Sequence, residues 1–348
     1  MKTKFALGAL ALAIAAIANP AAAQQFHRLE SATVIKVAQP EWDYLTIDPD
    51  HGHLFIAARD NGVVVYDVKA KKVLKTLEKS EGANASVVVP EFDRGYTVNE
   101  DGSITAFTLS TLKVIDRVKL GEDADAGFYD PKTKQIVVTR GDSKELTFVD
   151  AKSGKVTGRL AMESKKLEAT VADGKGVAFT ASRDRNSVFK IDMENRKQLA
   201  EWPVCDEANG IAMDRERGRV FVGCRGKNPV LAVLDADSGK VITTLEIGRG
   251  NDGVIYDPET RKIYASAGVD ANLVIYQQVD ADNYKLVEAT TTRPYARTMA
   301  LDPKTKKVYL VTAEGTADPA RKMSKGPAHF YPNRYFPGTF TLLTYAPK

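Results

Sequence analysis

The sequence is poor in the residues that hold transition metals and build thiol active sites. Its 348 residues include only two cysteines and four histidines, His27, His51, His53 and His329. No Gly-x-Ser-x-Gly nucleophile elbow, phosphate-binding P-loop or dinucleotide fingerprint is present. We therefore expect no nucleotide or flavin cofactor, and no haem-ligating motif supports a redox or cofactor-assembly role. A zinc or copper site is also disfavoured.

A bias of charge and a long hydrophobic run are lacking as well. The 49 Lys and Arg residues nearly balance the 45 Asp and Glu residues, and both are spread along the chain. Nothing resembles the basic stripe of a nucleic-acid-binding protein. After residue 23, no segment approaches the roughly 20 apolar residues of a membrane-spanning helix. We expect neither a nucleic-acid interface nor a transmembrane segment.

The first 23 residues have the pattern of a secretory signal peptide. Lys2 and Lys4 precede an apolar stretch over residues 5–18, and three alanines at 21–23 form a small-residue cleavage site. Cleavage there leaves residues 24–348 and lowers the formal net charge from +4 to +2. We expect a soluble, periplasmic or secreted protein in an oxidising compartment, where two cysteines can pair.

A strand–turn–strand unit recurs seven times and predicts the fold. Its copies include "LTIDPDHGHLFIAA", "AGFYDPKTKQIVVT", "IAMDRERGRVFVGC" and "GVIYDPETRKIYAS", spaced 41 to 45 residues apart, and a second hairpin follows each one. Four antiparallel strands per repeat, A to D, predict an all-β, seven-bladed β-propeller. The C-terminal segment 339–345 has no following strand D, and 32–38 supplies it, closing the ring. Residues 24–348 therefore form one domain.

The repeats resemble a known family. "GNDGVIYDPETRKIYAS" and "DADSGKVITTLEIG" are similar to the YVTN-type repeat of periplasmic YncE-like propellers. These propellers are similar in fold to the bacterial 6-phosphogluconolactonase-like proteins. The resemblance covers about residues 32–348 and implies the fold. Propellers of this kind include lactonases, redox enzymes, metal-site proteins and binding modules, so the fold alone does not choose a function.

A polar residue stands five positions before the end of strand A in every repeat. The seven residues are Asp43, Asn84, Asp125, Glu168, Asn209, Asp252 and Arg297. Strand A lines the central channel of a propeller, so we expect these side chains to converge at one opening, here called the mouth. Solvated strand starts are often polar in any case. Four carboxylates at one opening nevertheless repel one another and are expected to have raised pKa values, which marks a candidate site.

The ring suggests two alternative chemistries. Oxygen ligands from Asp43, Asp125, Glu168, Asn209 and Asp252 suit Ca²⁺ or Mg²⁺. A lactonase-type hydrolase would then use Glu168 or Asp125 as general base, with Arg297 or the cation polarising the carbonyl. Alternatively, the ring belongs to a binding site.

The loops between strands B and C open on the same face and carry arginines. Their first residues include Arg59, Arg140, Arg183 and Arg225. These arginines either form ion pairs between blades or hold a ligand that bears carboxylate, phosphate or hydroxyl groups.

The last blade has a long B–C connection, residues 314–338, in place of a short loop. It carries His329, Tyr331, Arg334 and Tyr335, and we expect it to cover the mouth as a lid. A plug packed by its own aromatic side chains and a subunit contact are the alternatives.

The two cysteines flank strands A and B of blade five. Because these strands are antiparallel, Cys205 and Cys224 should meet at the mouth face, and we expect a disulfide between them. We expect an exported propeller whose mouth binds a small polar or anionic ligand, or a periplasmic protein partner. The alternative is the lactonase-type hydrolase with a central divalent cation.

Overall fold

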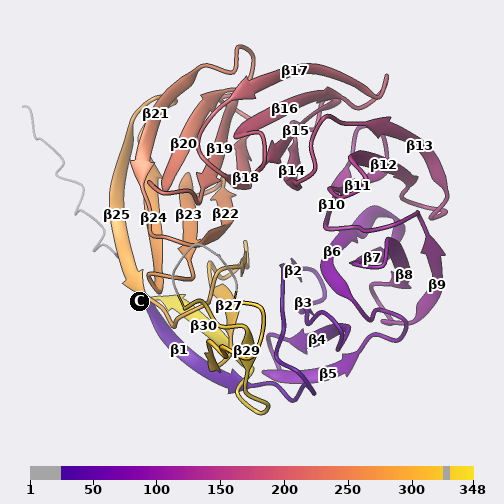
Figure 1. The fold of residues 1–348 in the computed structure, drawn as a ribbon, viewed down its shortest axis with the longest axis vertical. Helices are drawn as coiled ribbons and strands as arrows, with labels where there is room; N and C mark the ends of the chain where they lie inside the picture. The colour runs from indigo at the N-terminus through magenta and orange to yellow at the C-terminus, as the bar shows by residue number, and fades with distance from the viewer. Residues whose placement is uncertain (1–24, 324–329) are drawn as a thin grey trace, which may run out of the picture.

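The computed structural model describes residues 25–323 and 330–348, which form seven four-stranded antiparallel sheets arranged in a ring (Figure 1). The predicted signal peptide and His329 lie outside the described residues. Blade one consists of β2 Leu45–Asp48, β3 His53–Ala57, β4 Val63–Asp67 and β5 Lys72–Thr76. Blade two consists of β6 Ala83–Val89, β7 Arg94–Asn99, β8 Ser103–Thr108 and β9 Val114–Lys119, with the 3-10 turn η1 Pro90–Phe92 after β6.

The next three blades repeat this pattern. Blade three consists of β10 Ala126–Asp130, β11 Gln135–Arg140, β12 Glu145–Asp150 and β13 Val156–Ala161. Blade four consists of β14 Leu167–Ala172, β15 Val177–Ser182, β16 Ser187–Asp192 and β17 Lys197–Pro203. Blade five consists of β18 Ala208–Asp214, β19 Arg219–Cys224, β20 Val230–Asp235 and β21 Val241–Glu246.

The last two blades complete the ring. Blade six consists of β22 Asn251–Asp257, β23 Lys262–Ala267, β24 Asn272–Gln278 and β25 Tyr284–Thr291. Blade seven consists of β26 Met299–Leu301, β27 Val308–Thr312, β30 Thr341–Pro347 and β1 His27–Val34. Within its long loop, β28 Gly315–Thr316 pairs with β29 Arg334–Tyr335.

The N-terminal strand closes the ring, and the predicted fold is confirmed. β1 pairs with β30 from His27 opposite Pro347 to Val34 opposite Thr341. The strand begins five residues before the predicted segment 32–38, because the His27 amide and ring both bond to the buried Glu288 of blade six. It also ends earlier, because Ile35 turns into the core beside Trp42. The edge strands of an open sheet are thereby removed.

The core lies between the blades. The described apolar side chains form seven buried clusters, one at each contact between neighbouring blades. The middle strands are almost wholly buried, whereas outer strands such as β5 and β9 are largely exposed. Buried aspartates at the ends of the A strands, such as Asp130 and Asp257, accept hydrogen bonds from their hairpin turns. These interactions fix the hairpin turns that follow these A strands at the centre of the ring.

Candidate functional site

The structure brings most of the predicted ring together around one cavity. A cavity of about 310 Å³, here called the inner cavity, is lined by ring members Asp43, Asn84, Asp125, Glu168 and Asp252. Asn209 is fully buried beside this cavity and donates a hydrogen bond of 2.7 Å to Asp252. Arg297 lines a second cavity of about 1150 Å³ on the mouth side, here called the outer cavity. Arg59, Arg183, Arg225 and Asp252 line both cavities.

β-Bulges place the ring side chains at the start of the A strands. The strand register shifts across Asn84, Glu168, Asn209 and Asp252 in four different blades. A bulge redirects a side chain locally while the rest of the strand stays paired. In blades five and six a glycine follows the ring residue, and a Cβ on Gly210 would lie 3.0 Å from the Asp252 carbonyl oxygen. The A strands of these two blades therefore approach one another closely.

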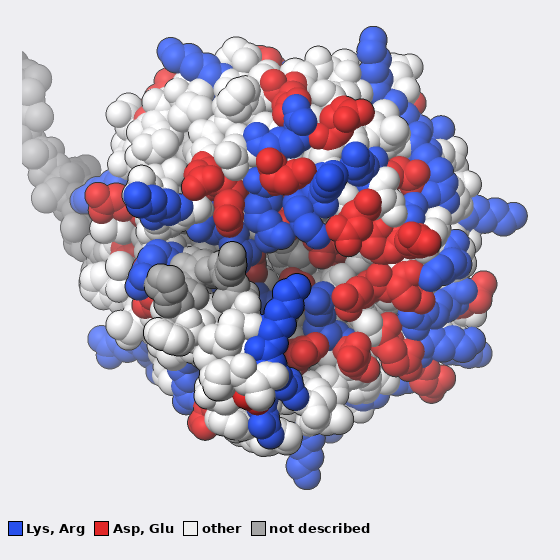
Figure 2. Space-filling view, in the orientation of Figure 1, with Lys and Arg blue, Asp and Glu red and all other residues white. Residues whose placement is uncertain are grey.

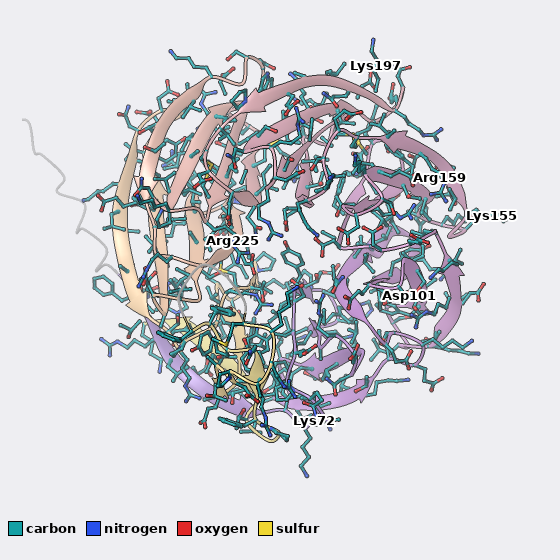
Figure 3. The ribbon with its side chains drawn as sticks, viewed as in Figure 1. Lys72, Asp101, Lys155, Arg159, Lys197 and Arg225 are labelled. Carbon is teal, nitrogen blue, oxygen red and sulfur yellow. A yellow bond between two sulfur atoms is a disulfide. The ribbon has the colours of Figure 1, made fainter. Side chains whose placement is uncertain are left out.

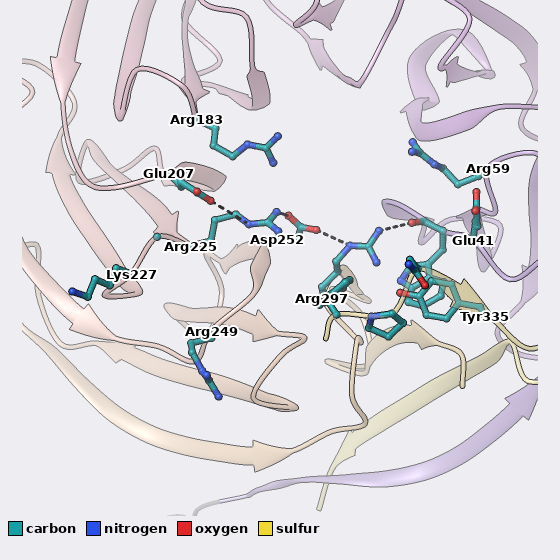
Figure 4. Close-up of a pocket in the computed structure, with 15 residues that line it drawn as sticks. Glu41, Arg59, Arg183, Glu207, Arg225, Lys227, Arg249, Asp252, Arg297 and Tyr335 are labelled. Carbon is teal, nitrogen blue, oxygen red and sulfur yellow. Dashed lines mark hydrogen bonds and ion pairs between the residues drawn. The ribbon is translucent and has the colours of Figure 1, made fainter. Parts of the chain in front are cut away.

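Asp252 is the centre of a chain of ion pairs across the mouth (Figure 4). Its Oδ1 lies 2.6 Å from Nη1 of Arg225, and its Oδ2 lies 2.7 Å from Nε of Arg297. Arg297 also donates to the Trp42 carbonyl oxygen at 2.6 Å, and its guanidinium lies over the Trp42 ring. Glu207 lies 4.0 Å from Arg225 at the other end of the chain. Both oxygens of Asp252 are therefore engaged by arginines.

The remaining ring carboxylates have weaker partners. Arg59 contacts Asp43 at 3.5 Å and forms a short hydrogen bond with Asn84. Arg183 lies 3.2 Å from Oε1 of Glu168. Among the described residues, no Lys, Arg or His lies within 4 Å of the Asp125 carboxylate. The acids of blades three and four therefore carry less compensation than Asp252.

Burial and mutual repulsion raise the pKa values of these acids. Burial raises the pKa of Asp43 to about 7, with a further contribution from Asp125 and an opposing one from Arg297. Burial and then the neighbouring Asp125 raise the pKa of Glu168 to about 8. The pKa of Asp125 is also raised by burial. The expectation of raised pKa values at the ring thus agrees with the geometry of these three carboxyl groups.

Tyr44 lies at the base of the inner cavity and was not singled out from the sequence. It lines the polar inner cavity and also a more apolar cavity, with Ile211 and Leu301. Burial and the nearby Glu168 and Asp252 raise the pKa of its phenol well above the usual value, so the phenol remains a hydrogen-bond donor. The only sequence signal is its place next to Asp43.

The long loop of blade seven forms one wall of the outer cavity. Tyr331 and Tyr335 both line this cavity with Trp42, whose ring centroid lies 4.9 Å from that of Tyr335. The loop is held by β28–β29 pairing and by Asn333, whose side chain bonds to the main chain of Asp318. Arg334 points to Asp318 and does not line the cavity.

The arginines of the B–C loops do not all reach the site. Arg59, Arg183 and Arg225 line both cavities, whereas Arg140 lines neither. Arg140 is the last residue of β11 and pairs with Glu145 at 2.7 Å, and it also donates to the Glu122 carbonyl oxygen. In blade three, Arg140 is aligned with Ser182 and Cys224, while Gly141 occupies the position of Arg183 and Arg225. A shift of one residue along a strand turns a side chain to the other face.

The ring acids do not fit a calcium or magnesium ion as they lie here. Within residues 25–323 and 330–348, no three His, Cys, Asp or Glu side chains converge as a metal-binding group. A cation at Asp252 would require Arg225 and Arg297 to leave its carboxylate. The donor set instead combines carboxylates with guanidinium groups, which suits polar ligands.

Cys205 and Cys224 form a disulfide in the structure, with Cα atoms 5.9 Å apart. Cys224 immediately precedes Arg225, whose amide donates to the Glu207 carbonyl oxygen at 3.1 Å. The disulfide thus fixes the segment that carries Glu207 next to the arginine that binds Asp252. His51 and His53 stack in the first A–B hairpin, and neither lines the mouth cavities.

Several outer-cavity residues were missed by the sequence analysis. Lys227, Arg249, Glu41, Glu207 and Asn333 all line the outer cavity. They lie in loops of different length in different blades, so no fixed repeat position marks them. Figure 2 shows the mouth face hollowed at its centre, with basic side chains at the edge of the hollow and acidic side chains gathered to its right. Figure 3 shows Arg225 near the centre, in contrast to Arg159 and Lys197 at the periphery.

Comparison with known proteins shows distant similarity to YncE. The chain is 19% identical to the YncE proteins of Salmonella typhi and Salmonella typhimurium over 176 residues. The match covers 49% of this chain and spans about half the length of those relatives. No family model matches the chain. None of the described helices is long and apolar enough to cross a membrane.

Solved structures show the same fold at low sequence identity. Hydrazine synthase of Kuenenia stuttgartiensis aligns over 80% of this chain and 94% of its own, with a TM-score of 0.68 and 16% identity. The WD40 repeats of RRP9 align over 93% of this chain and 100% of theirs, with a TM-score of 0.74 and 11% identity. These similarities establish the propeller fold and carry no functional assignment.

Proposed function

We propose that this YncE-like propeller is exported and binds a small anionic ligand in the outer cavity. One observation carries the proposal: the outer cavity is lined by six cationic side chains and three carboxylates. The cations are Arg59, Arg183, Arg225, Lys227, Arg249 and Arg297. A cavity of about 1150 Å³ with this lining suits a ligand of many atoms that bears at least one carboxylate or phosphate.

The six cationic side chains differ in whether they already form ion pairs with carboxylates of the protein. Arg225 and Arg297 share Asp252, and Arg249 binds Asp270 at 2.6 Å. No carboxylate of the described residues lies within 4 Å of the Lys227 ammonium group, which is exposed at the edge of the cavity. Lys227 is therefore free to meet an incoming anion, while the paired arginines present their remaining N–H donors in fixed directions.

The aromatic wall supports a ligand with a flat or apolar part. Trp42, Tyr331 and Tyr335 line the cavity, with the Arg297 guanidinium over the Trp42 ring, and Tyr331 also contacts Tyr295. Export rests on the signal-peptide pattern of residues 1–23, and the Cys205–Cys224 disulfide suits an oxidising compartment. In its broader form, the proposal includes a protein partner that presents an acidic group to the same face.

Calorimetric titration with glutarate and with inorganic phosphate tests the proposal. The double variant Lys227→Gln/Arg249→Gln leaves the Asp252 ion pairs intact, and we expect it to weaken binding at least tenfold. Arg334→Gln is the matched control, because Arg334 lies in the wall-forming loop but outside the cavity. Equal binding by the double variant and the control would refute the proposal.

A lactonase-type hydrolase is the second candidate, and one observation favours it. Glu168 has a pKa of about 8, so its carboxylate is a stronger base than usual and lies beside Asp125 in a cavity. Arg297 retains one terminal nitrogen that could polarise a carbonyl group. Glu168→Gln and Asp125→Asn are expected to reduce the turnover of any lactone at least 100-fold. Unchanged turnover would remove both residues from the reaction.

A further inference from the structure

The inner and outer cavities differ in the sign of their lining charges. The inner cavity is lined by seven carboxylates and four cations, whereas the outer cavity is lined by three carboxylates and six cations. The two cavities share Arg59, Arg183, Arg225 and Asp252, which form the boundary between them. A ligand that spans this boundary therefore meets opposite charge at its two ends.

The carboxylates of the inner cavity are incompletely satisfied. Glu168 is 7% exposed, and among the described residues its carboxylate has one cationic partner, Arg183, 3.2 Å from Oε1. The Asp125 carboxylate has no cation within 4 Å in the described part of the chain. A buried carboxylate without a partner is unfavourable, and a cation brought by a ligand would satisfy it.

We propose that the mouth binds a zwitterionic ligand, with its oxyanion in the outer cavity and its ammonium group in the inner cavity between Asp125 and Glu168. This inference rests on the anion site proposed above and adds the second charge. An ammonium group has three N–H donors and no acceptor, which suits carboxylate oxygens that lack donors. The inner cavity of about 310 Å³ has room for an ammonium group with part of an alkyl chain.

Neighbouring groups support this placement. Tyr44 and Asn84 also line the inner cavity and can orient the methylene chain or bound water. Burial raises the pKa of Asp43 to about 7 and that of Glu168 to about 8, so without a ligand each of these carboxyl groups takes up a proton near neutral pH. A bound ammonium group would stabilise their charged forms.

A matched pair of probes tests the inference. We expect 5-aminopentanoate to bind at least tenfold more tightly than pentanoate, a difference of about 1.4 kcal/mol. The pair 3-aminopropylphosphonate and propylphosphonate distinguishes a phosphate-like oxyanion from a carboxylate. Asp125→Asn should bring the ratio of the two affinities close to one, because only the aminated probe has a group that binds this carboxylate, and Glu168→Gln provides a second, isosteric test.

The possible outcomes distinguish a failure of the zwitterion inference from a failure of the proposed anion site. Equal affinities for the aminated and plain probes would overturn the zwitterion inference and leave the anion site intact. Equal weakening of both probes by Asp125→Asn and by Glu168→Gln would also overturn it, because these residues would then act on the site as a whole. Failure of all four probes to bind would overturn both proposals.

Discussion

The polar ring has two halves that treat the same kind of residue differently. In blades five to seven, Asp252 receives Arg225, Arg297 and Asn209, so its charge is neutralised by direct contacts. In blades three and four, Asp125 and Glu168 lie side by side in the inner cavity with one guanidinium contact at 3.2 Å. Equivalent strand positions therefore produce one ion-pair network and one group of poorly compensated acids.

The two halves of the ring therefore have different roles: one stabilises the fold, and the other is available for binding. A carboxylate shared by two arginines holds neighbouring blades together, and its removal leaves two cations partly buried. Acids that lack partners destabilise the empty protein and remain available to a ligand. Functional sites commonly retain such unfavourable groups.

Removal of the shared carboxylate should have the largest effect. Asp252→Asn leaves Arg225 and Arg297 without their main partner, and we expect a loss of about 4 kcal/mol in the free energy of unfolding. Urea denaturation monitored by far-ultraviolet circular dichroism measures this loss. Arg183→Gln, which breaks a single contact in the other half, is the matched control and should lose less than half as much. Similar losses would mean that the two halves do not differ.

Removal of the disulfide should cause the second-largest loss of stability. We expect this loss to affect the half of the ring that contains Asp252. The cysteines are 19 residues apart, and closing a loop of that length stabilises a protein by about 3 kcal/mol. We expect the Cys205→Ser/Cys224→Ser variant to lose about that amount in urea denaturation. Hydrogen exchange should increase at the amides of Arg225 and Gly226, which bond to the Cys205–Ala208 segment. Faster exchange at Arg183 alone would contradict this assignment.

The pH dependence of stability tests the half of the ring that contains Asp125 and Glu168. The folded-state pKa of Glu168 is about 8, above its ordinary value of 4.5, so the folded protein binds more protons than the unfolded chain between these values. Its contribution to stability is therefore greatest at low pH and is lost as the pH rises through this window, with a slope of at most about 1.4 kcal/mol per pH unit. Unfolding measured from pH 4.5 to 8 should show this loss in the wild type relative to Glu168→Gln. A constant difference between the two proteins would show that Glu168 does not titrate in this range.

Much of this architecture could be predicted from the sequence because propeller repeats carry strong local signals. The Asp-Pro turns and alternating apolar strands gave seven blades, and counting back from the strand ends gave the ring position of Asp252 and Glu168. Pairing partners could not be predicted in the same way. They depend on bulges, and on which arginines of neighbouring blades reach each carboxylate.

Arg140 shows the limit most clearly. In the sequence it was grouped with Arg183, yet it lies one residue earlier on its strand and binds Glu145. That single-residue offset reverses the direction of the side chain. Lys227 was missed for a related reason, since it lies in a rim loop with no counterpart at a fixed repeat position.

The smallest predicted change is an increase in stability, caused by Asp125→Asn. The equivalent substitution in the other half of the ring, Asp252→Asn, is expected to lower stability. Asp125→Asn removes a carboxylate whose pKa is raised by burial and which has no cation within 4 Å among the described residues. It also relieves repulsion on Glu168, whose pKa Asp125 raises. We therefore expect the variant to be more stable at pH 8 by about 0.5–1 kcal/mol, within the range of ordinary stabilising substitutions, and to show a lower pKa for Glu168 by ¹³C-detected nuclear magnetic resonance titration. Destabilisation by Asp125→Asn would mean that Asp125, like Asp252, is held by a partner when the protein is free and is not available to an ammonium group.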